Sequence, residues 1–148
     1  FDNCKNGFDK IANKVFFLGE SGVAHSIKLA MNLQITMLAL ALSEGIIFMK
    51  KANVDPKIFL EILNSTYFKT GMSEKKAFKM IENKFDATFT LSNLKKDIST
   101  ITSVAKSLGI ELPMIKKAEQ VYENAVKEGF GGIDYTGIIE YIKKINNL

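Results

Sequence analysis

The stretch GESGVAHSIKLAMN, Gly19 to Asn32, decides the fold because it leads into an almost wholly apolar run that ends at Met49. Few helix breakers interrupt the chain from Ser21 to Ala52, so the pattern predicts one helix of about thirty residues. That is long for a globular protein, where helices average about 10–14 residues. A helix that is apolar on nearly every side needs neighbours on most sides. We therefore predict an all-α fold, a helical bundle around one long central helix.

Capping residues mark about five further helices. We expect them over residues 53–65, 69–83, 91–110, 112–132 and 134–148, with a loop over 84–90. Asp55 is a good N-cap with Pro56 at the first helical position, and Asp134 is the expected cap of the last helix. Gly109 and Gly129 are expected helix stops. For residues 1–17 we expect a broken helix, followed by a short apolar strand over Val15–Leu18 that ends at the first glycine of the opening stretch.

Composition narrows the classes of protein. The 148 residues fit one domain, and nearly half are apolar, so a sizeable core is possible. A single cysteine, Cys4, excludes a disulfide framework within the chain and a cysteine zinc cluster, so we expect no metal. The near absence of cysteine also makes a reducing, cytoplasmic location the expected one. No signal peptide is recognisable, and a start at Phe1 rather than methionine favours a processed chain or part of a longer one.

The net charge of +4 comes from lysines spread among acidic residues, with no arginine. This pattern is typical of solvated helix faces and argues against a nucleic-acid partner. The run from Leu29 to Met49 is long enough to cross a membrane. It contains Asn32 and Glu44, which would be costly inside a bilayer. We therefore predict a buried central helix and no membrane contact.

Two alternatives remain open for the opening stretch. Gly19 and Gly22 precede a helix that could bind an anion at its N-terminus, but neither the Walker nor the dinucleotide spacing is present, so a tight turn is favoured. At 100° per residue, Lys28, Asn32 and Thr36 fall on one side of the helix. Lys28 is then either a lysine that extends to solvent near a helix end, or one at the rim of a cleft that is available for proton transfer.

Three other polar or glycine-rich features have ordinary explanations. The only histidine, His25, lies at a helix start without a nucleophile near it in sequence, and one histidine cannot make a metal site. The run of Lys95, Lys96 and Asp97 would serve as a solvated face, and Phe89 as part of the core. The segment GFGGID, residues 129–134, is expected to be a helix stop and turn.

Taken together, four stretches resemble the C-terminal helical domain of the β-hydroxyacid dehydrogenases, in the order expected for that family. They are GESGVAHSIKLAMN, then SEG at 43–45, FTLSNLKKD at 89–97 and GFGGIDYTGII at 129–139. The resemblance implies the fold of the C-terminal domain of the 6-phosphogluconate dehydrogenase-like proteins. Ala24 stands where that family has a third glycine, and Met31 where many members have a second asparagine.

The resemblance also implies roles for individual residues. Lys28 matches the catalytic lysine, a general base in oxidation and a general acid in reduction. Asn32 matches the asparagine that contacts substrate, and Lys96 matches the lysine near the nicotinamide of NAD or NADP. Phe89 and Asp97 match residues that border the same substrate site. The substrate would be a small hydroxyacid or semialdehyde.

The resemblance covers only the helical half of such an enzyme. Residues 1–20 would be a linker or the end of a preceding domain, and 21–148 a helical substrate-binding and dimerisation domain. The Rossmann domain that holds most of the cofactor has no counterpart in these residues, so we expect this chain alone to be inactive and to form a homodimer or higher homo-oligomer. The alternative hypothesis is a helical dimerisation or interaction module without catalysis, which would need neither the spacing of Lys28 and Asn32 nor the KKD segment.

Overall fold

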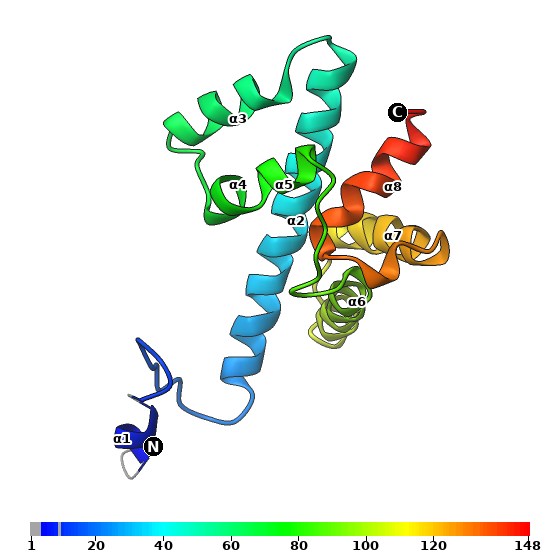
Figure 1. Ribbon diagram of the computed structural model, residues 1–148. Helices are drawn as coiled ribbons and strands as arrows, with labels where there is room; N and C mark the ends of the chain where they lie inside the picture. Colours follow the sequence, from blue (N-terminus) through cyan, green and yellow to red (C-terminus); the bar gives the residue numbers. More distant parts are fainter. Residues whose placement is uncertain (1–3, 9) are drawn as a thin grey trace.

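The computed structural model describes residues 4–8 and 10–148, and over these residues the chain is helical without a β-strand (Figure 1). The long helix α2 (Val23–Lys51) runs through the middle of the fold, as predicted. The other elements are α1 (Lys5–Phe8), α3 (Pro56–Ser65), α4 (Gly71–Lys75), α5 (Ala77–Ile81), α6 (Leu91–Ser107), α7 (Pro113–Lys127), two 3₁₀ turns, η2 (Phe130–Gly132) and η3 (Tyr135–Gly137), and α8 (Ile138–Ile145).

The core lies where α2 meets two groups of helices. On one side α2 packs against α3, α4 and α5, and on the other against α6, α7 and α8 (Figure 1). Helix α6 contributes a buried stripe at the predicted helical spacing: Leu94, Ile98, Ile101 and Ala105. The fold class and the central helix are thus confirmed, because apolar side chains on both flanks of α2 require neighbours on both sides.

Several predicted helix ends are confirmed. The Asp55 carboxylate accepts a hydrogen bond from the Lys57 N–H at 2.9 Å, and Pro56 is the first residue of α3. Gly109 and Gly129 follow α6 and α7 with φ of 69° and 91°, a left-handed conformation that residues with a Cβ adopt at a cost. Asp134 caps η3, the turn that leads into α8, rather than α8 itself.

Two predicted elements are wrong. Val15–Leu18 has no regular secondary structure, and its aromatic side chains Phe16 and Phe17 lie exposed rather than in a core. The single helix expected over residues 69–83 is divided at Lys76 into α4 and α5. In the region of the predicted broken helix, Cys4 is in a 3₁₀ conformation and α1 follows it, whereas residues 1–3 and 9 lie outside the described residues.

Helix α2 is long and apolar enough to cross a membrane on length and composition, and it alone meets that criterion among the described residues. In its most apolar window 44% of the residues are buried inside the fold. Its buried polar side chains, Asn32, Thr36 and Ser43, all form hydrogen bonds within the chain. These features are typical of a core helix, and the absence of membrane contact stays a prediction.

Candidate functional site

Three of the predicted site residues meet at one carboxylate oxygen. Lys28 and Asn32 lie one turn apart on α2, and Asp97 faces them from α6. Asp97 Oδ2 accepts a hydrogen bond from Asn32 Nδ2 at 2.7 Å and one from Lys28 Nζ at 3.2 Å. Because Asp97 is 65 or more positions away from Lys28 and Asn32 in the sequence, the packing of α2 on α6 creates the cluster.

The buried polar side chains of α2, which are Asn32, Thr36 and Ser43, form a polar seam along the otherwise apolar helix. The hydroxyl of Thr36 donates to the Asn32 carbonyl at 2.8 Å, and Ser43 donates in the same way to Ala39 at 2.7 Å. Such bonds to the carbonyl four residues earlier allow hydroxyl side chains to be buried inside a helix. The seam can therefore pass through the core without unpaired polar groups and leave Asn32 aimed at Asp97.

Burial differs sharply across the cluster. The side chain of Asp97 is 11% exposed, whereas that of Lys28 is 57% exposed. The carboxylate is fixed from two directions, and the ammonium group that it holds still reaches solvent. A lysine anchored in this way can exchange a proton with a molecule bound beside it. The geometry agrees with the first alternative for Lys28, a lysine that extends to solvent near a helix end, and its availability for proton transfer at the rim of a cleft stays a prediction.

The other two predicted site residues do not touch this cluster. The Phe89 ring is half-buried and packs edge-on against the Tyr135 ring, with 6.0 Å between ring centres. Lys96 is exposed on α6, and no ion pair of its amine is found in the part of the chain that the structure describes. Their assignments to substrate and cofactor stay predictions.

The glycines before α2 have a conformational explanation. Gly19 and Gly22 have φ of 84° and 100°, and Gly22 is the N-cap of α2 without a side-chain hydrogen bond. A Cβ at either position would meet nothing within 4 Å. The left-handed backbone, rather than a close approach to another part of this chain, is therefore what requires glycine here.

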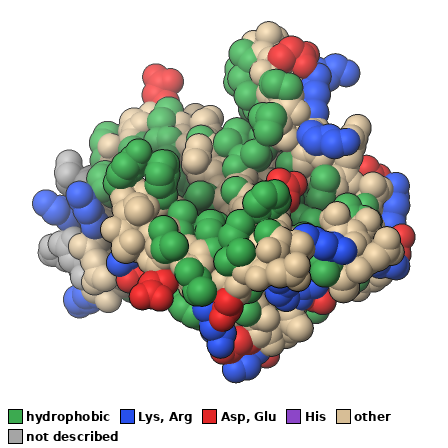
Figure 2. All heavy atoms as spheres, turned by 90° about the horizontal axis from the view of Figure 1, so that it is seen from above, with side chains coloured by type: hydrophobic (Ala, Val, Ile, Leu, Met, Phe, Trp, Pro, Cys, Tyr) green, Lys and Arg blue, Asp and Glu red, His purple; other side chains and the backbone are tan. Residues whose placement is uncertain are grey.

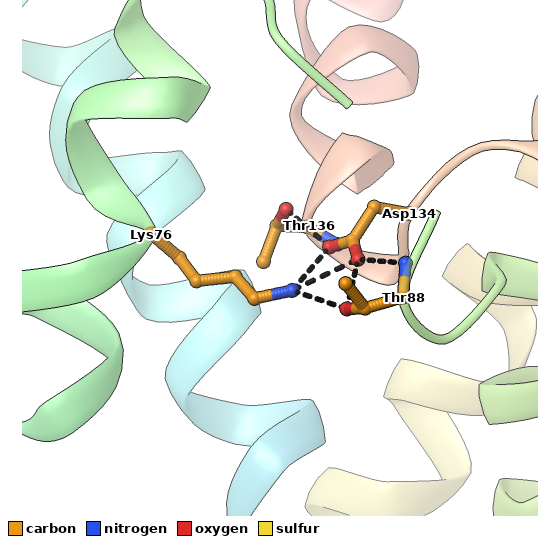
Figure 3. Close-up of polar contacts among 4 residues, drawn as sticks. All are labelled: Lys76, Thr88, Asp134 and Thr136. Atoms are coloured by element: carbon orange, nitrogen blue, oxygen red, sulfur yellow. Dashed lines mark hydrogen bonds and ion pairs between the residues drawn. The ribbon is translucent and has the colours of Figure 1, made fainter. Parts of the chain in front are cut away.

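A second polar cluster, of which the sequence indicated only the cap at Asp134, surrounds that residue (Figure 3). Lys76 Nζ lies 3.1 and 2.8 Å from the two carboxylate oxygens and 4.7 Å from the centre of the Tyr135 ring. Thr88 and Thr136 each donate a backbone N–H and a hydroxyl to the carboxylate. Burial alone would raise the pKa of Asp134, but these donors outweigh it and lower the pKa from 3.8 to about 2.

The Asp134 cluster joins three segments: the α4–α5 break, the loop before α6 and the start of η3 (Figure 3). The predicted N-cap at Asp134 was the only signal for it, because Lys76 is 58 positions away. All its donors are satisfied within the fold, which is typical of a structural clamp. No group of three histidine, cysteine or acidic side chains suitable for a metal occurs within residues 4–8 and 10–148.

An all-α fold around one long central helix is the fold that the resemblance to the β-hydroxyacid dehydrogenases implies. Comparison with known families agrees with this class, because the profile described as "NAD-binding of NADP-dependent 3-hydroxyisobutyrate dehydrogenase" matches residues 22–142. The chain therefore belongs to the 3-hydroxyisobutyrate dehydrogenase-like family of β-hydroxyacid dehydrogenases.

Individual relatives support the same family. An uncharacterized oxidoreductase of Bacillus subtilis, YfjR, is 31% identical over 91% of this chain and 48% of its own length. Glyoxylate/succinic semialdehyde reductase 2 of Arabidopsis thaliana is 26% identical over 91% of this chain and 38% of its own length. The crystal structure of a Salmonella typhimurium 3-hydroxyisobutyrate dehydrogenase covers 95% of this chain with a TM-score of 0.88 at 18% identity, a likeness of fold. The chain spans about half or less of the length of each of these proteins.

Proposed function

We propose that this chain is the C-terminal helical part of an NAD(P)-dependent 3-hydroxyacid dehydrogenase, with Lys28 as its catalytic residue. The observation that carries the proposal is the convergence of Lys28 and Asn32 on one oxygen of the buried Asp97, with the ammonium group left accessible. The family and the enzyme names of relatives support an oxidoreductase. The proton-transfer role itself rests on the geometry and on the family resemblance.

Lys28 would take the hydroxyl proton of the substrate during oxidation and return a proton to the carbonyl oxygen during reduction. Asn32 donates through Nδ2 to Asp97, so its carbonyl oxygen Oδ1 can accept a hydrogen bond from the substrate. Oδ2 of Asp97 holds both α2 side chains, and Oδ1 of Asp97 has no hydrogen-bond partner among the described residues. Asp97 would therefore position Lys28 through one oxygen and border the substrate with the other.

The proposal includes a nicotinamide cofactor that supplies or accepts hydride when bound. A dinucleotide is held by a parallel sheet and a glycine-rich turn, and the described residues form no strand. The cofactor, NAD or NADP, would therefore be held mainly by a Rossmann domain outside this chain, with the exposed Lys96 toward the nicotinamide. The chain alone would lack activity. The substrate would be a small hydroxyacid or semialdehyde, and the enzyme a cytoplasmic homo-oligomer.

Two substitutions in a complete enzyme that carries this chain test the role of Lys28. Lys28→Ala removes the proton-transfer group, and loss of general acid–base assistance is expected to lower kcat about 10²–10⁴-fold. Lys28→Arg keeps a positive charge beside Asp97 but cannot release its proton, so it should lower kcat by a similar factor. Lys106→Ala, at an exposed lysine near the end of α6, is the matched control and should leave kcat unchanged.

The assay is turnover with a panel of 3-hydroxyacids and semialdehydes and with both cofactors. If Lys28→Arg kept near-normal kcat, only the charge of Lys28 would matter and proton transfer by this residue would be refuted. A folded complete protein that converted no member of the panel would contradict the enzymatic proposal. That result would favour the alternative of a helical interaction module.

A further inference from the structure

The only histidine of the chain, His25, lies on the same side of α2 as the residues of the candidate site. The seven positions from His25 to Asn32 turn the helix through about 700°, so the two residues lie within about 20° of each other around the helix axis. Lys28 comes one turn after His25, and side chains three positions apart on a helix are neighbours, with about 5–6 Å between their Cβ atoms. His25 therefore extends the polar seam of α2 toward the start of the helix.

His25 lies where α2 is not covered by other helices, since the first turns of α2 extend beyond the helices that pack on it (Figure 1). Residues 23–28 are all exposed, and Leu29 is the first buried residue of the helix. The imidazole of His25 has no hydrogen bond or ion pair in the part of the chain that the structure describes. The opposite end of the molecule, where α2 ends, presents hydrophobic side chains across the middle of its face and no visible histidine (Figure 2). A free imidazole and an accessible ammonium group thus lie on neighbouring turns at one end of the helix.

Proton transfer by Lys28 needs a second group that restores it after each turnover. In the oxidation direction Lys28 gains the hydroxyl proton of the substrate, and it has to lose that proton before the next turnover. Asp97 is a poor exit for the proton, because its side chain is only 11% exposed and already accepts a hydrogen bond from Asn32. Substrate and nicotinamide bound beside Lys28 would exclude water from the site. The proton therefore needs a side chain that lies between Lys28 and solvent.

We propose that His25 relays this proton between Lys28 and solvent, an inference that rests on the proposed dehydrogenase function. In oxidation the substrate hydroxyl gives its proton to the Lys28 amine while hydride passes from the substrate carbon to the nicotinamide. The resulting ammonium group gives a proton to a neutral ring nitrogen of His25, and the imidazolium releases a proton to water. Reduction runs the same steps in reverse. Histidine suits this task because its charge ordinarily changes between about pH 5 and pH 8.

The relay predicts a pH dependence of the rate. The charged groups at this end of α2 include Lys28 on the helix itself, Glu20 in the turn before it and Asp97, which α6 brings to Lys28. Oxidation requires a neutral imidazole as proton acceptor, so kcat should fall as the pH drops through the range in which histidine takes up a proton. His25→Gln should lose this part of the pH profile and keep KM. It should lower kcat near pH 7 about tenfold or more, but less than Lys28→Ala does, because water can replace the imidazole in part.

The measurement is kcat and KM of a complete enzyme that carries this chain, from about pH 5 to pH 9, with and without imidazole in the buffer. Circular dichroism confirms that each variant is folded. Imidazole should restore most of the rate of His25→Gln but not that of Lys28→Ala, which lacks the group that takes the substrate proton. The matched control His25→Gln/Ala24→His moves the ring about 100° around the helix and should stay slow.

The outcomes separate the relay from the proposed function. An unchanged kcat and pH profile in His25→Gln, beside an inactive Lys28→Ala, would overturn the relay alone, as would full activity of the control with the moved ring. A slow His25→Gln that imidazole does not restore, or one with a raised KM, would also overturn it, since His25 would then serve structure or substrate binding. A complete protein without turnover would refute the proposed dehydrogenase function together with the relay.

Discussion

The Asp134 cluster predicts that part of the stability of the chain is lost in acid. The folded pKa of Asp134 is about 2, below its ordinary value of 3.8, so this group contributes stability above its unfolded pKa and loses it as the pH falls through its folded pKa. At about 1.4 kcal/mol for each pKa unit, the contribution is about 2 kcal/mol. It should be present at pH 6 and should disappear between about pH 5 and pH 2.

The perturbation is Asp134→Asn, which removes the titrating group but keeps its size. The free energy of unfolding is measured by urea denaturation at intervals from pH 2 to pH 7. The wild type should lose about 2 kcal/mol more than the variant across the acid window, because every other carboxylate titrates in both proteins. Asp86→Asn, at an exposed aspartate in the loop between α5 and α6, is the control and should follow the wild-type curve. Parallel curves for wild type and Asp134→Asn would refute the assignment of a depressed pKa to Asp134.

Two further predictions concern stability. Gly137→Ala should lower the free energy of unfolding by about 1–3 kcal/mol in urea denaturation, because the new Cβ would lie 2.2 Å from Ile133 Cδ1. Gly132→Ala is the control, since a Cβ there would meet no atom within 4 Å, and equal effects of the two substitutions would contradict the packing argument. Asp55→Ala should lower the free energy of unfolding by about 0.5–2 kcal/mol, because it removes the N-cap of α3. Asp55→Asn can still accept a hydrogen bond from the Lys57 N–H and should lower it less; an equal loss in both variants would mean that the cap is not the cause.

The elements predicted best are those with local determinants. Helix α2 follows from a continuous apolar run, and the start of α3 from an aspartate and a proline in adjacent positions. The break at Lys76 has no such determinant. The backbone bends at Lys76, where φ is −116°, and the side chain of the same residue reaches Asp134, 58 positions later, so a contact that no local pattern encodes lies at the break. The predicted strand at Val15–Leu18 failed for a related reason, since a short apolar run does not determine a strand without the tertiary context of a sheet.

The candidate site shows the same limit. The spacing of Lys28 and Asn32 placed them on one helix face, and the resemblance singled out Asp97, but neither could say that all three meet at a single oxygen. That meeting depends on how α6 crosses α2, which is decided by buried side chains such as Leu29, Leu94 and Ile101. Phe89 was also singled out by the resemblance; its ring packs on Tyr135, and its contact with substrate stays a prediction.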